Sequence, residues 1–327
     1  MASTQQSHRE CILALMDLGT NSVRLSLVHL HQDGTYTVLA RLREAVRLGE
    51  GEFAGHRIQH EAMERTILAC SKLAQFARDN HADELIAVAT SASREAENQA
   101  ELLQRLHQQA GMDMRVISGS EEARLMYRGL VGDVSLGQDK ALFVDVGGGS
   151  TEIVVGNQQR HDYLTSLPLG AIRLTNLYIP DREAAVSAHT FAKLKCHVRE
   201  VMADSLEQLR KYTLTMLVGT SGTFEHLANV TAMHYFQRPW DTSDVLSYEQ
   251  MHSVITMLCS LPLQHRRQVP GLGTERADII IGGAAIIDTL LETLHISVVR
   301  VSKRGLRDGL LAEYIDHHVS TAEPPRL

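Results

Sequence analysis

Along this chain, short runs of apolar residues alternate with longer stretches in which an apolar residue recurs at about every third or fourth position. The short runs predict strands, and the longer periodic stretches predict amphipathic helices. Strands are expected at 11–17, 22–30, 35–43, 84–90, 114–118, 141–146, 151–155, 162–167, 214–219 and 296–302. Helices are expected at 56–80, 94–110, 119–130, 188–211, 275–294 and 305–318. This mixture of strands and crossover helices indicates an α/β fold.

One pattern occurs twice in the chain. An apolar run, an aspartate, a glycine with small hydroxyl or amide residues and a second apolar run appear at 14–30 and again at 141–156. An internal duplication explains this best, as two similar α/β halves that face each other across a cleft, each with one aspartate-glycine hairpin. A single core seldom grows beyond about 250 residues, so two domains are expected for a chain of 327. The boundary is expected in the stretch 130–141, which gives domains at 1–132 and 133–327, with the final helix able to pack back on the first domain.

Composition narrows the class of partner. The formal net charge of −7 argues against nonspecific nucleic-acid binding, which depends on a basic surface. No apolar run approaches the roughly 20 residues of a membrane helix, and the amino terminus lacks the pattern of a secretory signal, so a cytoplasmic protein is expected. The four cysteines, Cys11, Cys70, Cys196 and Cys259, lie far apart. Their spacing favours buried free thiols over a metal or disulfide site.

Three glycine-rich turns follow predicted strands and gather backbone N–H groups with small polar side chains. Such turns form good cradles for an anion, and phosphate is the natural guest. At the third turn a helix begins, which adds the positive end of its dipole. Each alone is equally explained as a simple turn, whereas three together favour a polyphosphorylated ligand. The candidate phosphate-binding residues are Gly19, Thr20, Asn21 and Ser22 in the first turn, Gly147, Gly148, Gly149, Ser150 and Thr151 in the second, and Gly219, Thr220, Ser221, Gly222 and Thr223 in the third.

Carboxylates accompany two of these turns. Asp17, Asp145 and Glu152 lie beside them at strand ends. A carboxylate next to bound phosphate is repulsive unless a hard cation lies between them, so Mg²⁺ is the expected mediator. The competing interpretations are that Asp17 and Asp145 are turn-forming residues and that Glu152 is an ordinary solvated strand residue.

Two adjacent glutamates begin the helix expected at 119–130. With Ser118 as the N-cap, Glu121 occupies the capping-box position and so has a structural role. Neighbouring helix residues point about 100° apart, so Glu122 is available as a general base near an attacking water. Spacing alone favours the other interpretation, a solvated glutamate stabilised by the helix dipole.

A polyanion must meet local basic residues on this acidic chain. Arg94 opens a predicted helix, where the dipole disfavours a cation; a bidentate phosphate contact would explain it, and a surface arginine is the alternative. Strand alternation places Arg41 and Arg43 on one face, either beside successive phosphates or as a solvated face. Further basic residues are Arg47, Arg300, Lys303, Arg304 and Arg307.

The motifs as a set resemble one family, the exopolyphosphatase and guanosine pentaphosphate phosphohydrolase family (Ppx/GppA), within the sugar kinase, Hsp70 and actin superfamily. The resemblance covers about residues 11–314. The motifs, in the family's order, are DLGTNSVRL, ATSASREA, VISGSEEARLMYRG, FVDVGGGSTEIVVG, LPLGAIRLT, VGTSGTFEHLA and SKRGLRDGLL.

The resemblance implies a fold of two RNase-H-like domains of the actin and Hsp70 type, which face each other across an active-site cleft. It implies that Glu122 is the catalytic base, that Asp145 and Glu152 handle Mg²⁺, and that Arg94 and the three turns contact phosphate. The chain stops at Leu327 with the polar segment STAEPPRL and without the additional helical region of long members, so it resembles a short, two-domain member.

The function expected from these observations is an exopolyphosphatase that releases terminal phosphate from inorganic polyphosphate by Mg²⁺-assisted attack of water. Guanosine pentaphosphate is the alternative substrate. A kinase on the same fold and a non-hydrolytic sensor of alarmone or polyphosphate are rivals from other classes. No nucleic-acid or membrane partner is expected, and a homodimer is one option for the oligomeric state.

Overall fold

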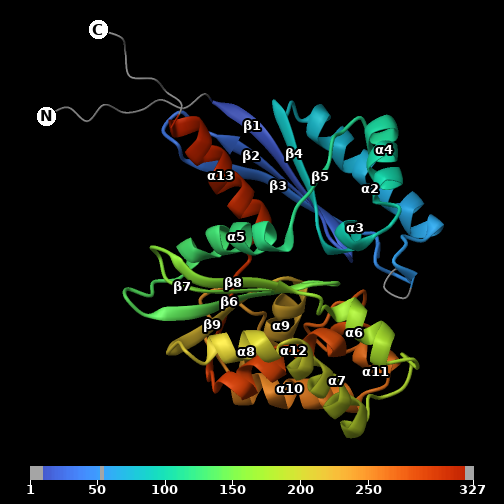
Figure 1. Cartoon of the computed structure of the whole chain (residues 1–327), viewed down its shortest axis with the longest axis vertical. Helices are drawn as coiled ribbons and strands as arrows, with labels where there is room; N and C mark the ends of the chain where they lie inside the picture. The colour runs from blue at the N-terminus through green and yellow to red at the C-terminus, as the bar shows by residue number, and fades with distance from the viewer. Residues whose placement is uncertain (1–9, 52–54, 321–327) are drawn as a thin grey trace, which may run out of the picture. The chain divides into compact units, whose positions relative to one another are not determined.

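The computed structural model describes residues 10–51 and 55–320, so the polar segment STAEPPRL lies, apart from Ser320, outside the described residues. The chain forms two compact units (Figure 1). The first contains the described residues up to Ser118 and the helix that begins at Leu306, and the second contains residues 119–305. The division falls before the helix at 119–130, earlier than the boundary expected between residues 132 and 133.

A five-stranded mixed sheet, in the order β3-β2-β1-β4-β5, forms the centre of the first unit. β1 (Cys11–Leu18), β2 (Ser22–Leu30) and β3 (Tyr36–Ala45) pair antiparallel, whereas β4 (Glu84–Ala89) runs parallel to β1 and β5 (Arg115–Val116) runs parallel to β4. The helices of this unit are α2 (His60–Asp79), α3 (Ser91–Glu95), α4 (Gln99–Arg105) with the π-helical turn η1 (Leu106–Ala110), and α13 (Leu306–Ser320).

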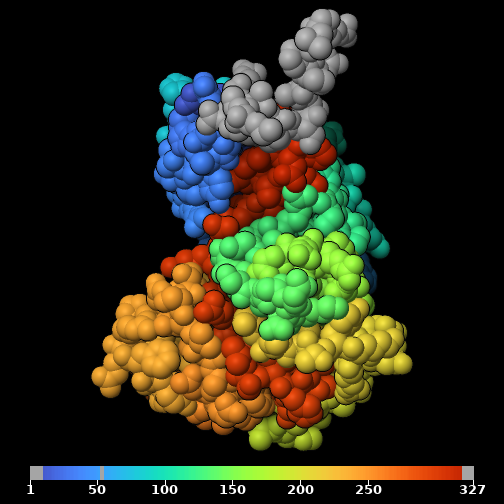
Figure 2. Space-filling model, turned by 90° about the vertical axis from the view of Figure 1, so that its left-hand side faces the viewer, coloured from blue at the N-terminus to red at the C-terminus, as the bar shows by residue number. Residues whose placement is uncertain are grey.

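Alternation along β1 gives this sheet two different faces. Ala14, Met16 and Leu18 are buried and pack with the apolar side of α2 into one core. The opposite face of β1 is covered by α13, where the Cys11 thiol and the Tyr314 hydroxyl are 3.9 Å apart. In the space-filling view the red residues of α13 lie beside the blue residues of the first strands (Figure 2). The last helix of the chain thus completes the first unit.

The second unit is built on a six-stranded mixed sheet in the order β10-β11-β9-β6-β7-β8. Its strands are β6 (Lys140–Val146), β7 (Thr151–Gly156), β8 (His161–Leu167), β9 (Leu214–Thr220), β10 (Leu246–Ser247) and β11 (Val298–Val301). Its helices are α5 (Gly119–Leu130), α6 (Ala171–Tyr178), α7 (Ala188–Val201), α8 (Ala203–Leu209), α9 (Gly222–Phe236), α10 (Tyr248–Ser260), α11 (Leu263–Arg266) and α12 (Ile280–Leu294), with a 3₁₀ turn η2 (Val131–Asp133) after α5.

Helices cover both faces of this second sheet. A large apolar core joins one face to α6, α7, α9, α10 and α12. On the other face, Met126 and Tyr127 of α5 pack with Phe143 of β6 and Val154 of β7. This packing is why α5 belongs with the second unit, although in sequence it directly follows the first.

The two sheets repeat one topology, which confirms the predicted α/β duplication. The order β3-β2-β1-β4 in the first matches β8-β7-β6-β9 in the second, with two antiparallel hairpins followed by a parallel strand in each. Each unit therefore carries one tight hairpin between its first two strands.

Several helices are shorter than their periodicity predicts. The helix expected at 94–110 is broken after Glu95, although it ends at Gly111 in the left-handed conformation (φ 62°) as expected. The helix expected at 188–211 is interrupted at Met202. No helix in the described part of the chain is both long and apolar enough to cross a membrane. All four cysteines are free thiols, but Cys196 is exposed rather than buried.

Candidate active site

The β6–β7 hairpin places two predicted carboxylates opposite each other. Asp145 pairs with Glu152 in the antiparallel register, one residue pair before the turn. A hydrogen bond of 3.0 Å from Gly147 N to Ser150 O closes the turn. Asp145 is half-buried, whereas Glu152 is only 1% exposed, so the hairpin carries one of its carboxyl groups into the interior.

The glycines of this turn direct their carbonyl groups toward α6. Gly147 O and Gly148 O accept from the first N–H groups of α6, each at 2.9 Å, and Gly149 O accepts from Arg173 Nε at 2.8 Å. The peptide bonds of the described residues are trans, so the N–H groups of the same peptide units, on Gly148, Gly149 and Ser150, point the opposite way. Three N–H groups that point away from α6 can form the predicted anion cradle.

The third predicted phosphate loop lies beside this hairpin. Thr220, at the end of β9, pairs with Asp145 in the parallel register, and α9 begins two residues later. The hydroxyl groups of Ser221 and Thr223 donate to Val146 O at 2.9 and 3.0 Å, and that of Thr220 donates to the Arg304 carbonyl at 2.6 Å. These three hydroxyl groups therefore donate to main-chain carbonyl groups. The part of the loop that is suited to meet an anion is therefore the amino terminus of α9.

Three carboxyl groups influence one another at this place. Burial raises the pKa of Glu152 well above its usual range, and the neighbouring charges of Glu122 and Asp145 raise it further. Hydrogen bonds from Ser150 and Ser166 lower the pKa of Glu152 and so oppose part of this rise. The distance from Ser166 Oγ to Glu152 Oε1 is 2.8 Å. Asp145 thus lies opposite Glu152 in the hairpin, and Glu122 is near enough for its charge to act on the same carboxyl group.

Asp145 and Glu152, which lie opposite each other on the hairpin, offer carboxylate oxygens to a divalent cation. Oxygen ligands are what Mg²⁺ prefers, and it is commonly held by one or two carboxylates plus phosphate oxygens and water. Burying several negative charges close together costs free energy unless a proton or a cation neutralises them. A cation held here would lie beside the glycine turn, where phosphate oxygens are expected.

The first turn of α5 supplies Glu122. Ala123 and Met126 of this helix are buried against the second sheet, which fixes the position of its amino-terminal turn. Glu121 and Glu122 are both half-buried. Glu122 is therefore not the fully solvated glutamate of the alternative interpretation, and its charge acts on the carboxyl group of Glu152.

The β1–β2 hairpin of the first unit repeats the turn of the second. Gly19 N donates to Ser22 O at 3.0 Å, as Gly147 N does to Ser150 O. Here Asn21 O accepts from two N–H groups of the segment after β3, at 3.0 Å each. Residues 19–22 therefore form the tight turn that was predicted, and hydrogen bonds to its carbonyl groups hold it in place.

Two buried polar side-chain atoms in the described part of the first unit lack a hydrogen-bond partner. Asn21 Oδ1 and Ser93 Oγ are buried and have no hydrogen bond to any of the described residues. Arg94, next to Ser93, is half-buried and donates from Nη1 to Ile117 O at 2.9 Å. It does not open a helix as expected. It lies in the last turn of α3, because the strand ends at Ala89 and the helix begins at Ser91, so the dipole favours its charge.

Asp17 makes an ion pair that was not predicted. Its Oδ2 is 3.2 Å from Nε of Arg307, which lies in the first turn of α13, and both side chains are largely buried. Burial lowers the pKa of Arg307, and the nearby charges of Arg24 and Arg41 lower it too, whereas Asp17 raises it. Arg24, Arg41 and Arg307 thus form an arginine cluster within the first unit.

Sequence reasoning missed two neighbours of the second hairpin. Ser166 binds Glu152 because β8 pairs with β7 and sets the two residues opposite each other. Arg173 binds the glycine turn from the first part of α6. The motif LPLGAIRLT begins at Leu167, directly after Ser166, and contains Arg173, so the resemblance indicated the segment but not the contacts.

Comparison with known proteins gives a consistent result. Residues 27–318 match the model of the Ppx/GppA phosphatase family. Exopolyphosphatase 1 of Mycobacterium tuberculosis is 28% identical over 305 residues, which are 93% of this chain and 88% of that protein.

Solved structures agree in fold over nearly the whole chain. An exopolyphosphatase from Cytophaga hutchinsonii has a TM-score of 0.88 at 26% identity, covering 94% of this chain and 98% of that one. The Ppx/GppA family member from Aquifex aeolicus has a TM-score of 0.74 at 27% identity, covering 94% and 99%. With its duplicated α/β sheets, its paired aspartate-glycine hairpins and a family match across 27–318, this chain belongs to the Ppx/GppA phosphatase family.

Proposed function

We propose that this protein is a Mg²⁺-dependent exopolyphosphatase, which removes the terminal phosphate of inorganic polyphosphate. The observation that carries the proposal is the group of Glu122, Asp145 and Glu152 beside a glycine turn whose N–H groups point away from α6. Membership of the family and the similarity to an exopolyphosphatase in sequence and in fold support it.

Asp145 and Glu152 are the residues that would hold the cation. When bound, Mg²⁺ would neutralise negative charge on the phosphate oxygens, and this would weaken their repulsion of the attacking oxygen. Ser166 donates to Glu152 and keeps that carboxyl group oriented on the hairpin. Burial raises the pKa of Glu152 and so disfavours the ionised form that a cation needs.

Glu122 has the role of general base. The oxygen of a water molecule forms a bond to the terminal phosphorus, the bridging P–O bond breaks, and the electron pair leaves with the shortened polyphosphate. Glu122 accepts the proton that the water loses. The N–H groups of Gly148, Gly149 and Ser150 donate to the oxygens of the terminal phosphate, so positioning and charge stabilisation supply most of the rate.

In this proposal the first unit has phosphate-contacting groups of its own. The buried Asn21 Oδ1 and Ser93 Oγ lack partners among the described residues. The Ser93 hydroxyl could donate to a phosphate oxygen, and a water molecule bound with the phosphate could donate to Asn21 Oδ1. Arg94 adds a cation on the same short helix as Ser93. Asp17 is assigned to hold Arg307, because the two form an ion pair, and not to bind the cation directly.

The test is a phosphate-release assay of the purified protein with short polyphosphate, long polyphosphate and guanosine pentaphosphate in parallel. Faster release from polyphosphate supports the proposal, and faster release from guanosine pentaphosphate assigns the alternative substrate. Tight binding of either ligand without release would identify a sensor instead. ATP-dependent phosphorylation of a small acceptor would identify a kinase.

A further inference from the structure

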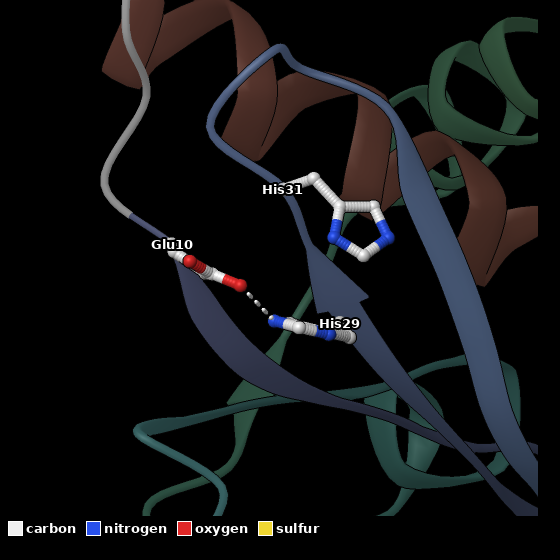
Figure 3. A group of neighbouring side chains, drawn as sticks. All are labelled: Glu10, His29 and His31. Carbon is white, nitrogen blue, oxygen red and sulfur yellow. Dashed lines mark ion pairs between the residues drawn. The ribbon is translucent and has the colours of Figure 1, made fainter.

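A cluster of Glu10, His29 and His31 lies at the end of the β1–β2 ladder that is remote from the 19–22 hairpin (Figure 3). One possible ligand atom of each residue lies within 4.8 Å of the other two. Glu10 Oε1 and His29 Nε2 are 2.9 Å apart. Among the residues that the structure describes, no other group of three His, Cys, Asp or Glu side chains meets this criterion.

The strand register produces this cluster. Ile12 pairs with His29 and Cys11 with Leu30, so one further step along the antiparallel ladder sets Glu10 opposite His31. His29 and His31 are two residues apart and so lie on the same face. All three side chains therefore emerge on one face, and the backbone, not a chance side-chain rotation, brings them together.

The ring of His31 is already oriented by a neighbour. His31 Nε2 and Thr37 Oγ1 are 2.8 Å apart. When Nε2 donates its proton to this hydroxyl, Nδ1 keeps a lone pair, and one ring nitrogen of His31 lies on the side of Glu10 and His29 (Figure 3). A histidine whose second nitrogen donates to an oxygen is the usual arrangement of a metal ligand.

We propose that Glu10, His29 and His31 bind one Zn²⁺ ion. Two imidazole nitrogens and one carboxylate oxygen are a ligand set of zinc, whereas Mg²⁺ prefers oxygen ligands alone. The bonds to zinc are about 2.0–2.2 Å, so the three ligand atoms must approach one another, and water can take the fourth position. The side chains of Glu10 and His29 are 50% and 30% exposed, which leaves them free to make this adjustment.

Bound zinc would connect the beginning of β1 to the end of β2. Without a metal, the cluster reduces to the pair of Glu10 with His29, and an exposed ion pair contributes little to stability. A metal bound by the folded chain instead stabilises it in proportion to its concentration relative to the dissociation constant. The proposal is independent of the reaction, because these residues lie at the opposite end of β1 from Asp17.

The experiment measures metal binding by the full chain and by three variants, His29→Gln, His31→Gln and His60→Gln. His60 is the matched control. It is exposed and its Nε2 lies 3.7 Å from Glu64 Oε1, as in a histidine-glutamate pair, but it belongs to no metal-binding group among the described residues. Zn²⁺ affinity is measured by calorimetry, and Co²⁺ is added as a probe with visible absorption. Melting temperatures without metal establish that each variant folds.

One Zn²⁺ per chain is expected for the wild-type protein and for His60→Gln, with a higher melting temperature on addition of Zn²⁺. Each of the other two variants should bind Zn²⁺ at least about tenfold more weakly and lose this rise, since each lacks one of three ligands. Phosphate release with Mg²⁺ should be unchanged in all three. Equal affinity in the wild type and in His29→Gln or His31→Gln, or no binding by the wild type, overturns the proposal.

Discussion

Glu121 and Glu122 are neighbours in the first turn of α5, and this pair allows a test with a built-in control. Glu122→Gln removes a proton acceptor but keeps the volume and most of the hydrogen bonding of the side chain. We expect kcat for phosphate release to fall by ~10² to 10⁴-fold, as for the loss of a general base, with polyphosphate binding nearly unchanged. If Glu122→Gln stays within a few fold of the wild type, or Glu121→Gln loses as much activity, the base is another residue.

In the proposed site, Glu152 would couple protonation to metal binding. Its pKa in the folded protein is raised above the usual value of 4.5, so without metal the folded state holds this proton more tightly than the unfolded state. The contribution of Glu152 to the free energy of unfolding is therefore complete below about pH 4.5 and is lost as the pH rises through the pKa of the folded state. Mg²⁺ needs the ionised carboxylate, so its stabilising effect should grow with pH.

The corresponding prediction compares Glu152→Gln with the wild type. The variant carries no charge to bury, so at neutral pH without Mg²⁺ we expect its melting temperature to be equal to or above that of the wild type. Mg²⁺ should raise the melting temperature of the wild type only, and the variant should need more Mg²⁺ for half-maximal activity. An unchanged Mg²⁺ requirement in this variant and in Asp145→Asn would remove both residues from the metal site.

The sequence indicated most of these residues but not their surroundings. The repeated aspartate-glycine pattern pointed to both hairpins, because a tight turn needs a local signal that the chain itself carries. The partner of Asp17 is Arg307, which lies 290 positions later on α13 (307 − 17), and no local pattern connects the two. The contact of Ser166 with Glu152 likewise depends on the register of β7 with β8.

At the scale of elements, α6 fixes the second hairpin, and Gly170 is the point of closest approach. A Cβ atom on Gly170 would lie 2.3 Å from Gly148 O and 2.4 Å from Gly149 N, both of them backbone atoms. The φ angle of Gly170 is −157°, which any residue adopts, so the effect of Gly170→Ala is steric alone. The turn must move if this methyl group is added.

We expect Gly170→Ala to lower the free energy of unfolding by about 1–3 kcal/mol, as for other overpacked sites. It should also slow phosphate release, because the N–H groups of the turn are displaced. Gly55→Ala is the control, since its added Cβ would meet no heavy atom of the described residues within 4 Å. Chemical denaturation and the release assay measure the two effects. A Gly170→Ala protein with normal stability and activity would contradict the role given to the turn.

Element boundaries were predicted less well than element types. Periodicity joined α3, α4 and η1 into one helix because the segment at 96–98 keeps polar and apolar residues in a helical spacing. In the structure, the Asn98 side chain accepts from Ile58 N at 2.9 Å, and Ala96 is extended at the end of α3. Tertiary hydrogen bonds of this kind outweigh weak helix propensity.

At the scale of the whole molecule, the proposed function requires an acidic chain to bind a polyanion. The net charge is −7, yet the arginine cluster of Arg24, Arg41 and Arg307 gathers positive charge within the first unit. Strand pairing adds Arg43 opposite Arg24. Arg41 is 45% exposed, and its ion pair with Asp308 is long at 3.7 Å, so its charge is available to a ligand.

The double substitution Arg41→Gln and Arg43→Gln tests whether this charge serves the substrate. We expect weaker polyphosphate binding with a flatter dependence on salt, because fewer ion contacts remain to be screened. Long polyphosphate should lose more affinity than short polyphosphate, since only a long chain extends beyond the catalytic turns. The control is the double substitution Arg57→Gln and Arg65→Gln, two arginines that are 60% and 45% exposed and pair with Glu101 and Glu50. Equal losses of affinity in both double variants, or equal losses for short and long polyphosphate, would show that Arg41 and Arg43 are ordinary solvated residues with no role in substrate binding.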